Sequence, residues 1–187
     1  MRQVQREPRA ATDADVRLGE TDVGRGVFVT RGFEEGEPVL PLHGELIDFA
    51  ASLAKGEREC DALQIGVDRY LDLEPPGVYV NHSCDPNVGI RADDQADGLV
   101  LVALRRLAAG EEIRYVYSTS MDEDHWTLEC RCGSPRCRGA IGDFKRLPRD
   151  LRLELIRREA VLPFIVAGEI ESGRLSGREI QRAPAAS

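Results

Sequence analysis

Three thiols lie within eight residues in Cys130-Arg131-Cys132-Gly133-Ser134-Pro135-Arg136-Cys137, and a fourth cysteine ends the polar segment Asn81-His82-Ser83-Cys84. Zinc binds thiolates at about 2.3 Å, and a structural zinc site is closed by four protein ligands in a tetrahedron. The spacing therefore predicts a structural zinc ion held by Cys84, Cys130, Cys132 and Cys137. The alternative is three free thiols and a buried Cys84. A metal here would join a C-terminal knuckle to an internal polar loop and so close a cover over a site.

The composition is that of a globular protein with one core and a small appendage. The chain has 187 residues, of which 42% are hydrophobic and 31% are charged. No apolar run approaches the ~18 residues of a membrane-spanning helix, and residues 1–12 lack the apolar stretch of a signal peptide. With Cys60 the one cysteine outside the metal-like spacing, a reducing compartment fits better than a disulfide framework. We therefore expect a cytoplasmic protein.

The net charge of the chain indicates which classes of binding partner are favoured. A net charge of −8 argues against direct binding to nucleic acid and mildly favours a basic partner. The sequence gives no indication of a membrane partner and does not fix the oligomeric state.

Short strands dominate the first two thirds of the chain, and helices the remainder. Apolar and alternating stretches predict strands over residues 26–31, 38–47, 62–67, 70–73, 99–104 and 113–117. Helical patterns cover residues 49–55 and 148–160, and the capping box Ser176-Gly177-Arg178-Glu179 indicates a last short helix. We expect a mainly β fold with C-terminal helices. Its parts are a leader over residues 1–15, a main domain over 16–120, a zinc segment over 121–144 and a helical tail over 145–187, frayed from residue 183.

Three motifs in the main domain carry residues that suit ligand binding. Gly24-Arg25-Gly26 lets the backbone approach a ligand closely, although a simple turn is the alternative. Asn81 and His82, which follow an expected apolar strand over Val78–Val80, can anchor a polar ligand, although a loop capped by Asx turns is equally compatible. Residues 110–117 carry two tyrosines on one face of a strand, which is also common in an amphipathic edge strand.

In this order, and followed by the cysteine knuckle, the motifs resemble the SET-domain protein lysine methyltransferases with a post-SET zinc motif, of the small, stand-alone, bacterial type. The matching phrases span roughly residues 16–144: Gly24-Arg25-Gly26-Val27-Phe28, Asn81-His82-Ser83-Cys84-Asp85-Pro86-Asn87, Ala103-Leu104-Arg105, Gly110-Glu111-Glu112-Ile113, Tyr115-Val116-Tyr117, Cys130-Arg131-Cys132-Gly133-Ser134 and Cys137-Arg138-Gly139.

The resemblance implies a fold of several small curved sheets in which the Asn-His-Ser-Cys segment threads beneath a later loop as a pseudoknot. It also implies a ligand set and a role for single residues. S-adenosylmethionine would be held by Gly24, Arg25, Gly26, Asn81 and His82, Tyr117 would be the active-site tyrosine, and Cys84 would be the fourth ligand of a structural zinc ion.

The function implied is S-adenosylmethionine-dependent N-methylation of lysine side chains in a protein, with a basic protein or peptide as substrate. One alternative is methylation of a small-molecule amine or another non-protein nucleophile. Another is a catalytically weak, zinc-stapled module that binds cofactor or peptide.

The chain departs from the family's pattern at several positions. Leu42, followed by His43, stands where many members have a tyrosine, which removes one orienting hydroxyl unless His43 partly replaces it. Val116 replaces a usual acidic residue, and the stretch between Asp48 and Tyr70, which normally shapes the substrate groove, is short. Trp126 could cover the adenine, wall the lysine channel or simply pin the linker to the core. The acidic residues 122–124 could attract a basic peptide or lie solvated.

Overall fold

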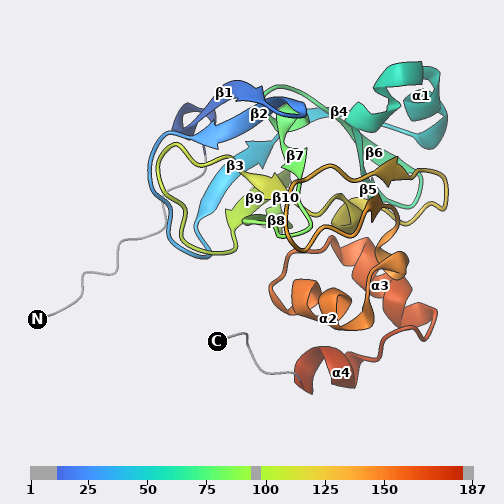
Figure 1. Ribbon diagram of the computed structural model, residues 1–187. Coiled ribbons are helices and arrows are strands. Elements are labelled where there is room, and N and C mark those ends of the chain that lie inside the picture. The colour runs from blue at the N-terminus through green and yellow to red at the C-terminus, as the bar shows by residue number, and fades with distance from the viewer. Residues whose placement is uncertain (1–11, 94–97, 183–187) are drawn as a thin grey trace, which may run out of the picture.

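Short strands form several small sheets, and the longer helices follow near the C-terminus (Figure 1). The computed structural model describes residues 12–93 and 98–182. Its strands are β1 (Val16–Thr21), β2 (Gly24–Val29), β3 (Pro38–Leu42), β4 (Gly44–Ile47), β5 (Ala62–Gly66), β6 (Arg69–Leu73), β7 (Asn81–His82), β8 (Val88–Asp93), β9 (Gly98–Ala103), β10 (Arg114–Tyr115), β11 (Leu128–Glu129) and β12 (Ala140–Ile141). The α-helices are α1 (Phe49–Ala54), α2 (Arg149–Arg157), α3 (Pro163–Glu171) and α4 (Gly177–Arg182). The predicted fold class is confirmed.

Five 3-10 helices connect these elements in the described ranges: η1 (Asp13–Asp15), η2 (Gly56–Asp61), η3 (Gly77–Tyr79), η4 (Tyr117–Ser120) and η5 (Phe144–Arg146). Most of the expected leader, residues 1–11, lies outside the described part, as do residues 183–187. At its end, η1 is held to the domain because the Asp15 carbonyl accepts a hydrogen bond from the Thr30 backbone N at 2.8 Å.

The sheets are mostly antiparallel. β1 and β2 form a hairpin, β9 is the middle strand between β3 and β8, and β6 is the middle strand between β4 and β5. β9 reads Gly-Leu-Val-Leu-Val-Ala, and its residues from Val100 onward are buried. A strand enclosed on both faces is expected to be apolar throughout, because neither face meets water.

One pair of strands is parallel and brings distant segments together. Asn81 of β7 lies opposite Arg114 of β10, and His82 lies opposite Tyr115. The contact continues past β7, where the Ser83 backbone N donates to the Tyr115 carbonyl at 3.0 Å. The Asn-His segment is therefore fixed directly beside the strand that leads to Tyr117.

The prediction of one strand over residues 38–47 is wrong. The chain leaves one sheet after Leu42 and enters another at Gly44, so β3 and β4 belong to different sheets. At Gly44 the backbone comes so close to its neighbour that an added Cβ would lie 2.1 Å from the Asp72 carbonyl oxygen. Glycine is required there because any side chain would collide with backbone atoms.

Gly44→Ala is therefore expected to destabilise the protein by about 3 kcal/mol or more, because backbone atoms must move to relieve the overlap. Urea unfolding followed by circular dichroism measures this change. Gly177→Ala is the matched control, because the added methyl group meets nothing within 4 Å at the start of α4. A Gly44→Ala protein as stable as the control would contradict this account of the sheet change.

Two further strands differ from expectation. The apolar residues Val78–Val80, expected as a strand, mostly form the 3-10 helix η3. The strand expected over residues 113–117 is reduced to β10, because the Val116 carbonyl accepts a hydrogen bond from the Thr119 backbone N at 2.9 Å and turns the chain into η4. The six-residue strands β1 and β8 were not predicted.

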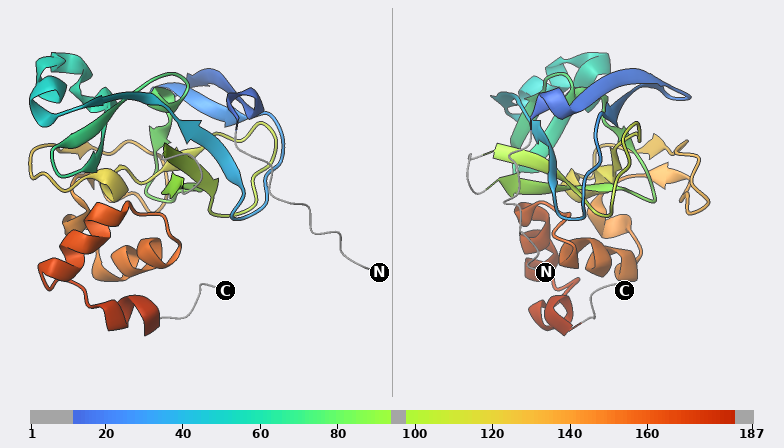
Figure 2. Two further views of the ribbon diagram at one scale, coloured as in Figure 1. Left: turned by 180° about the vertical axis from the view of Figure 1, so that it is seen from behind. Right: turned by 90° about the vertical axis from the view of Figure 1, so that its left-hand side faces the viewer.

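The C-terminal helices lie together on one side of the sheets (Figure 2). The predicted helix over residues 148–160 is confirmed as the shorter α2, and α4 begins directly after Ser176 as its capping box predicts. The Ser176 backbone N donates to Glu179 Oε2 at 2.8 Å. The helix α3 was missed. It is fixed by its buried Glu169, which is paired with Arg152 and, at 2.6 Å, with Arg174.

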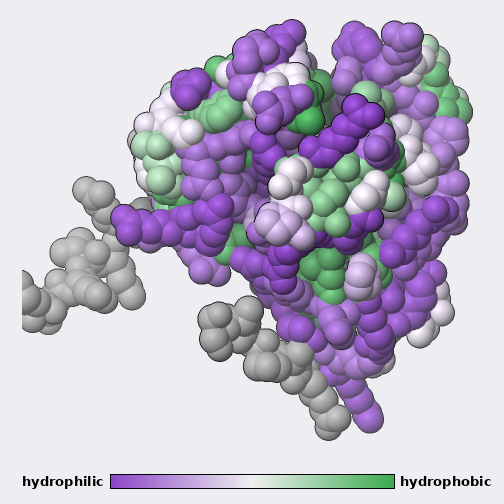
Figure 3. Space-filling model, in the orientation of Figure 1, coloured by the Kyte–Doolittle hydropathy of each residue, from purple (hydrophilic) through white to green (hydrophobic). Residues whose placement is uncertain are grey.

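The surface in the view of Figure 3 is mainly hydrophilic, with smaller apolar patches, as expected for a chain in which 31% of residues are charged. Among the helices that the structure describes, none combines the length and apolar character needed to cross a membrane.

Candidate functional site

Tyr117 is held by hydrogen bonds from both of its ends. It is the first residue of η4, where the chain turns away from β10. Its phenol donates to the Val80 carbonyl at 2.9 Å, and its backbone N donates to His82 Nδ1 at 3.2 Å. Burial raises the pKa of Tyr117 well above its ordinary value, so the phenol stays protonated at neutral pH. The hydroxyl is thus a fixed, neutral group.

His82 connects this tyrosine to the cysteines. Burial, and to a lesser extent the charge of Arg138, lower the pKa of His82 to about 4, so its ring is neutral at pH 7. A neutral ring that accepts at Nδ1 carries its proton on Nε2. That Nε2 lies 3.4 Å from Cys84 Sγ. The ring therefore lies between the tyrosine backbone and the sulfur atoms.

Asn81 joins the glycine-containing hairpin to the same place. Its Nδ2 donates to the Arg25 carbonyl at 3.0 Å and to Glu112 Oε1 at 2.9 Å. The Arg25 guanidinium lies over the Tyr79 ring, 4.3 Å from its centroid. The structure thus brings the backbone of the Gly24-Arg25-Gly26 strand, Asn81, His82 and Tyr117 together, as the sequence analysis expected.

A groove runs along these residues. We call it the Asn-His groove, and its volume is about 530 Å³. Asn81, His82 and Tyr117 line it together with Cys132 and Leu128 from the zinc segment. The predicted ligand-binding residues Gly24, Arg25 and Gly26 are not among its lining; the preceding Asp22 and Val23 of the same hairpin take that place.

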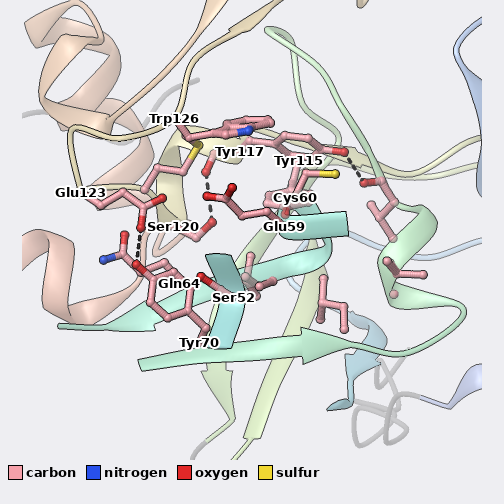
Figure 4. A pocket seen from close by; sticks show the side chains of 17 residues that line it. Ser52, Glu59, Cys60, Gln64, Tyr70, Tyr115, Tyr117, Ser120, Glu123 and Trp126 are labelled. Carbon is pink, nitrogen blue, oxygen red and sulfur yellow. Dashed lines mark hydrogen bonds between the residues drawn. The ribbon is translucent and has the colours of Figure 1, made fainter. Parts of the chain in front are cut away.

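A second, narrower cavity of about 70 Å³ also has Tyr117 in its wall (Figure 4). We call it the tyrosine cavity. Tyr115 and Tyr117 stand side by side in it, with ring centroids 5.0 Å apart. Trp126 is part of the lining, which places it at this cavity and not in the lining of the Asn-His groove. Since Tyr117 is common to both linings, the cavity and the groove approach each other at this residue.

Polar residues that no sequence motif indicated lie opposite Tyr117. The phenol of Tyr70 donates to Glu123 Oε2, and both residues line the tyrosine cavity with Glu59 (Figure 4). Burial raises the pKa of Glu123. Its neighbours in the acidic run are paired elsewhere, since Asp122 and Asp124 both contact Lys145. The acidic residues 122–124 indicated in the sequence that carboxylates gather near this site. The sequence could not show which of the three carboxylates lines the cavity.

Leu42 and His43, which stand where many family members have a tyrosine and its neighbour, lie near the tyrosine cavity. Leu42 is buried, and its Cδ2 is 3.0 Å from the position of a Cβ added to Gly77, a residue of the tyrosine cavity. His43 is exposed between β3 and β4 and is not among the residues that line this cavity. The possibility that its ring replaces the missing hydroxyl gains no support.

The four predicted zinc ligands lie together. The Sγ atoms of Cys84, Cys130, Cys132 and Cys137 all lie within 4.8 Å of one another, and those of Cys84 and Cys130 are 3.7 Å apart. Four sulfur atoms around a tetrahedral zinc ion at about 2.3 Å are about 3.8 Å from each other, so the donor set fits the metal. Burial raises the pKa of Cys84 and of Cys130, and a bound cation would favour the thiolate form of both.

Three features tie this cluster to the groove and to the Asn-His segment. The Arg138 backbone N donates to Cys84 Sγ at 3.4 Å, and the Cys132 carbonyl accepts from Arg114 Nη1 at 3.1 Å. Cys132 itself lines the Asn-His groove. The zinc segment is therefore one wall of that groove, and the sulfur cluster fixes it there.

Comparison with known proteins adds an independent line of evidence. The SET domain family model matches residues 24–118. The chain is 34% identical over 127 residues to histone-lysine N-methyltransferase trithorax of Drosophila virilis, which covers 62% of this chain and 3% of that protein. It is 32% identical over 127 residues to human histone-lysine N-methyltransferase 2B, covering 62% of this chain and 5% of that protein.

The Drosophila melanogaster histone-lysine N-methyltransferase ash1 is 39% identical over 137 residues, covering 67% of this chain and 6% of that protein. The chain thus spans only a small part of the length of these relatives. The family match nevertheless covers just over half of the chain and includes β2, β7, β10 and Tyr117. The chain belongs to the SET domain family.

Proposed function

We propose that this protein is an S-adenosylmethionine-dependent N-methyltransferase that acts on lysine side chains of a basic protein or peptide. The observation that carries the proposal is the position of Tyr117 in the walls of both the narrow tyrosine cavity and the wider Asn-His groove. Such an arrangement lets an amine and a methyl donor enter by separate openings and meet at one phenol. The relatives named as histone-lysine N-methyltransferases support this choice of reaction.

The Asn-His groove fits the methyl donor. Its volume of about 530 Å³ lies within the range of small-molecule sites, about 300–1,000 Å³. Asn81 and His82 supply polar groups, and Leu128 and Ile141 supply apolar surface. When bound there, S-adenosylmethionine supplies a methyl group on a cationic sulfur, and the amine nitrogen takes that carbon as the sulfur–carbon bond breaks.

The tyrosine cavity prepares the amine. A lysine amine is a nucleophile only when neutral, and its ordinary pKa of about 10.4 leaves it protonated at pH 7. Enclosure in a narrow cavity lined by Tyr115 and Leu63 disfavours the ammonium form through desolvation, and the positive sulfur of a bound methyl donor would disfavour it further. The carboxylate of Glu123 in the same lining acts in the opposite direction, because it attracts the ammonium form of an entering lysine. Because the Tyr117 phenol donates its proton to the Val80 carbonyl, its oxygen can accept an N–H from the amine. That contact orients the nitrogen lone pair.

The zinc ion has a structural part in this proposal. Cys84, Cys130, Cys132 and Cys137 would fill its four positions, which leaves none for a substrate. Its effect is to fix the zinc segment against the Asn-His groove.

The test is transfer of labelled methyl groups. The purified chain is incubated with S-adenosylmethionine carrying a labelled methyl group and with a mixture of proteins and lysine peptides, and mass spectrometry locates the label. We expect methylated lysine side chains in basic proteins. Label found exclusively on small amines would favour the small-molecule alternative. Binding of S-adenosylmethionine in a calorimeter with no transfer to any acceptor would favour a binding module.

A further inference from the structure

A second groove opens beside the tyrosine cavity. It has a volume of about 480 Å³, and we call it the α3 groove because Phe164, Ala167, Gly168 and Glu171 of α3 form one wall. The opposite wall comes from the hairpin of β5 and β6 and from the acidic run after η4. The helix α3 lies outside the residues 24–118 matched by the family model. This wall is therefore an addition of the chain's C-terminal part.

The α3 groove adjoins the tyrosine cavity. Gln64, Tyr70 and Glu123 line both of them. A peptide that inserts a lysine into the tyrosine cavity would therefore carry neighbouring residues past the α3 groove. Because an extended chain advances about 3.3 Å per residue, residues close to the lysine in sequence are the ones that would reach it.

The charge of the α3 groove is negative. Four carboxylates line it, from Asp68, Asp122, Glu123 and Glu171, and no Lys or Arg is among the described residues that do so. Asp122 Oδ1 lies 3.3 Å from Lys145 Nζ, so that carboxylate is balanced from outside the groove. The Asp68 carboxylate accepts a hydrogen bond from a neutral donor, the Phe49 backbone N, at 2.9 Å, and Glu171 is exposed on α3.

Aromatic and apolar surface accompanies these carboxylates. Phe49 and Tyr70 stack with ring centroids 5.9 Å apart, and Phe164 faces the same groove from α3. Val67, at the tip of the β5–β6 hairpin, is 87% exposed. Aromatic faces next to carboxylates are the surroundings that a guanidinium prefers, because it stacks on rings and donates paired hydrogen bonds to a carboxylate.

We propose that the α3 groove binds an arginine side chain of the substrate protein, close in sequence to the lysine that enters the tyrosine cavity. The occupant is an arginine-bearing segment, recognised by the carboxylates of Asp68 and Glu171 and by the rings of Phe49 and Phe164. The inference rests on the proposed function and adds a specificity site to it.

The test uses paired synthetic peptides. Each carries one lysine in an alanine, serine and glycine background, with a single arginine placed in turn at every position up to about four residues to either side. Its partner carries citrulline, which keeps the shape and loses the charge. We expect at least one arginine position to raise kcat/KM about tenfold over its citrulline partner, the effect of one charge-assisted hydrogen bond pair.

The variant Asp68→Asn/Glu171→Gln is expected to reduce this preference to about twofold and to leave the rate with the citrulline peptide unchanged, because it removes charge without changing shape. Asn at position 68 also suits the positive φ of 52° found there. Glu35→Gln is the matched control, because Glu35 is an exposed carboxylate of the turn between β2 and β3 and does not line the groove. The proposal is overturned if no arginine position is preferred, or if the double variant keeps the full preference.

A second experiment tests the α3 groove even if the proposed methyltransferase function is wrong. If no peptide is methylated, fluorescence anisotropy of labelled arginine and citrulline peptides still measures the α3 groove. Tighter binding of an arginine peptide that is lost in Asp68→Asn/Glu171→Gln would support the groove, and equal binding of both peptides would refute it. If sedimentation shows instead that the double variant disrupts a dimer, a second copy is the occupant and the proposal is wrong.

Discussion

Tyr117→Phe is expected to lower kcat for methyl transfer by about 10²–10³-fold, the usual cost of removing one preorganised hydrogen-bonding group from an active site. The phenol is held by the Val80 carbonyl at 2.9 Å and stands in the walls of both the tyrosine cavity and the Asn-His groove. Phenylalanine keeps the ring that packs on His82 and Tyr115. The variant therefore loses the hydroxyl that we propose orients the amine but keeps the shape of the cavity.

Two measurements separate this effect from a loss of folding. Calorimetry with S-adenosylhomocysteine is expected to give a dissociation constant close to that of the unchanged protein, because the Asn81 and His82 contacts remain. Thermal unfolding is expected to change little, since one neutral hydrogen bond contributes about 1 kcal/mol.

The control is Tyr79→Phe, which also removes a phenol and keeps the ring over which Arg25 lies. It is expected to retain transfer activity. A Tyr117→Phe protein with kcat within a few-fold of the unchanged enzyme would remove Tyr117 from the mechanism, even if the fold and the groove are as described.

The convergence at this site could be predicted because its motifs are local and chemically distinctive. The cysteine spacing indicated a metal cluster, and the family resemblance implied that Asn81 and His82 lie beside Tyr117. The structure brings these residues within hydrogen-bonding distance of their partners. What the sequence could not give was the lining of the groove. Backbone turns decide that Asp22 and Val23 line it and that Gly24 and Gly26 do not.

The single strand predicted over residues 38–47 shows why part of the fold could not be predicted from the sequence. Residues 38–47 are rich in apolar residues, which suits one long strand, and both β3 and β4 are in fact extended. The change of sheet depends on the close approach of Gly44 to Asp72, which are far apart in sequence. Such a contact is fixed by tertiary packing and leaves no local pattern.

The acidic residues 122–124 and the helix α3 show that functional surfaces, too, depend on tertiary contacts that the sequence does not reveal. Asp122, Glu123 and Asp124 look alike in sequence, but Tyr70 draws one of them to the tyrosine cavity and Lys145 holds the other two. The helix α3 has no clear apolar stripe, because one of its two buried residues is the polar Glu169, which is paired with Arg152 and Arg174. Amphipathic periodicity therefore missed the helix that forms the wall of the α3 groove.

Loss of the proposed zinc ion is expected to have the second large effect. Metal analysis of the purified protein should find zinc, and Cys132→Ser or prolonged chelation should remove it. Structural zinc sites contribute folding energy directly, with apparent binding free energies of about 10–16 kcal/mol in small zinc domains. In this protein the cluster joins Cys84, beside the Asn-His segment, to a zinc segment with only the short pair β11 and β12 for secondary structure.

We therefore expect the unfolding midpoint to fall by about 10 °C or more, since each kcal/mol corresponds to about 2–4 °C in a chain of this size. Limited proteolysis should then cut within residues 121–144, and the affinity for S-adenosylhomocysteine should fall because Cys132 lines the Asn-His groove. Cys60→Ser is the matched control for metal content, because Cys60 lies outside the cluster. If Cys132→Ser retained its zinc, the four-sulfur site would be wrong; if it lost zinc but bound S-adenosylhomocysteine unchanged, the metal would have no part in shaping the groove.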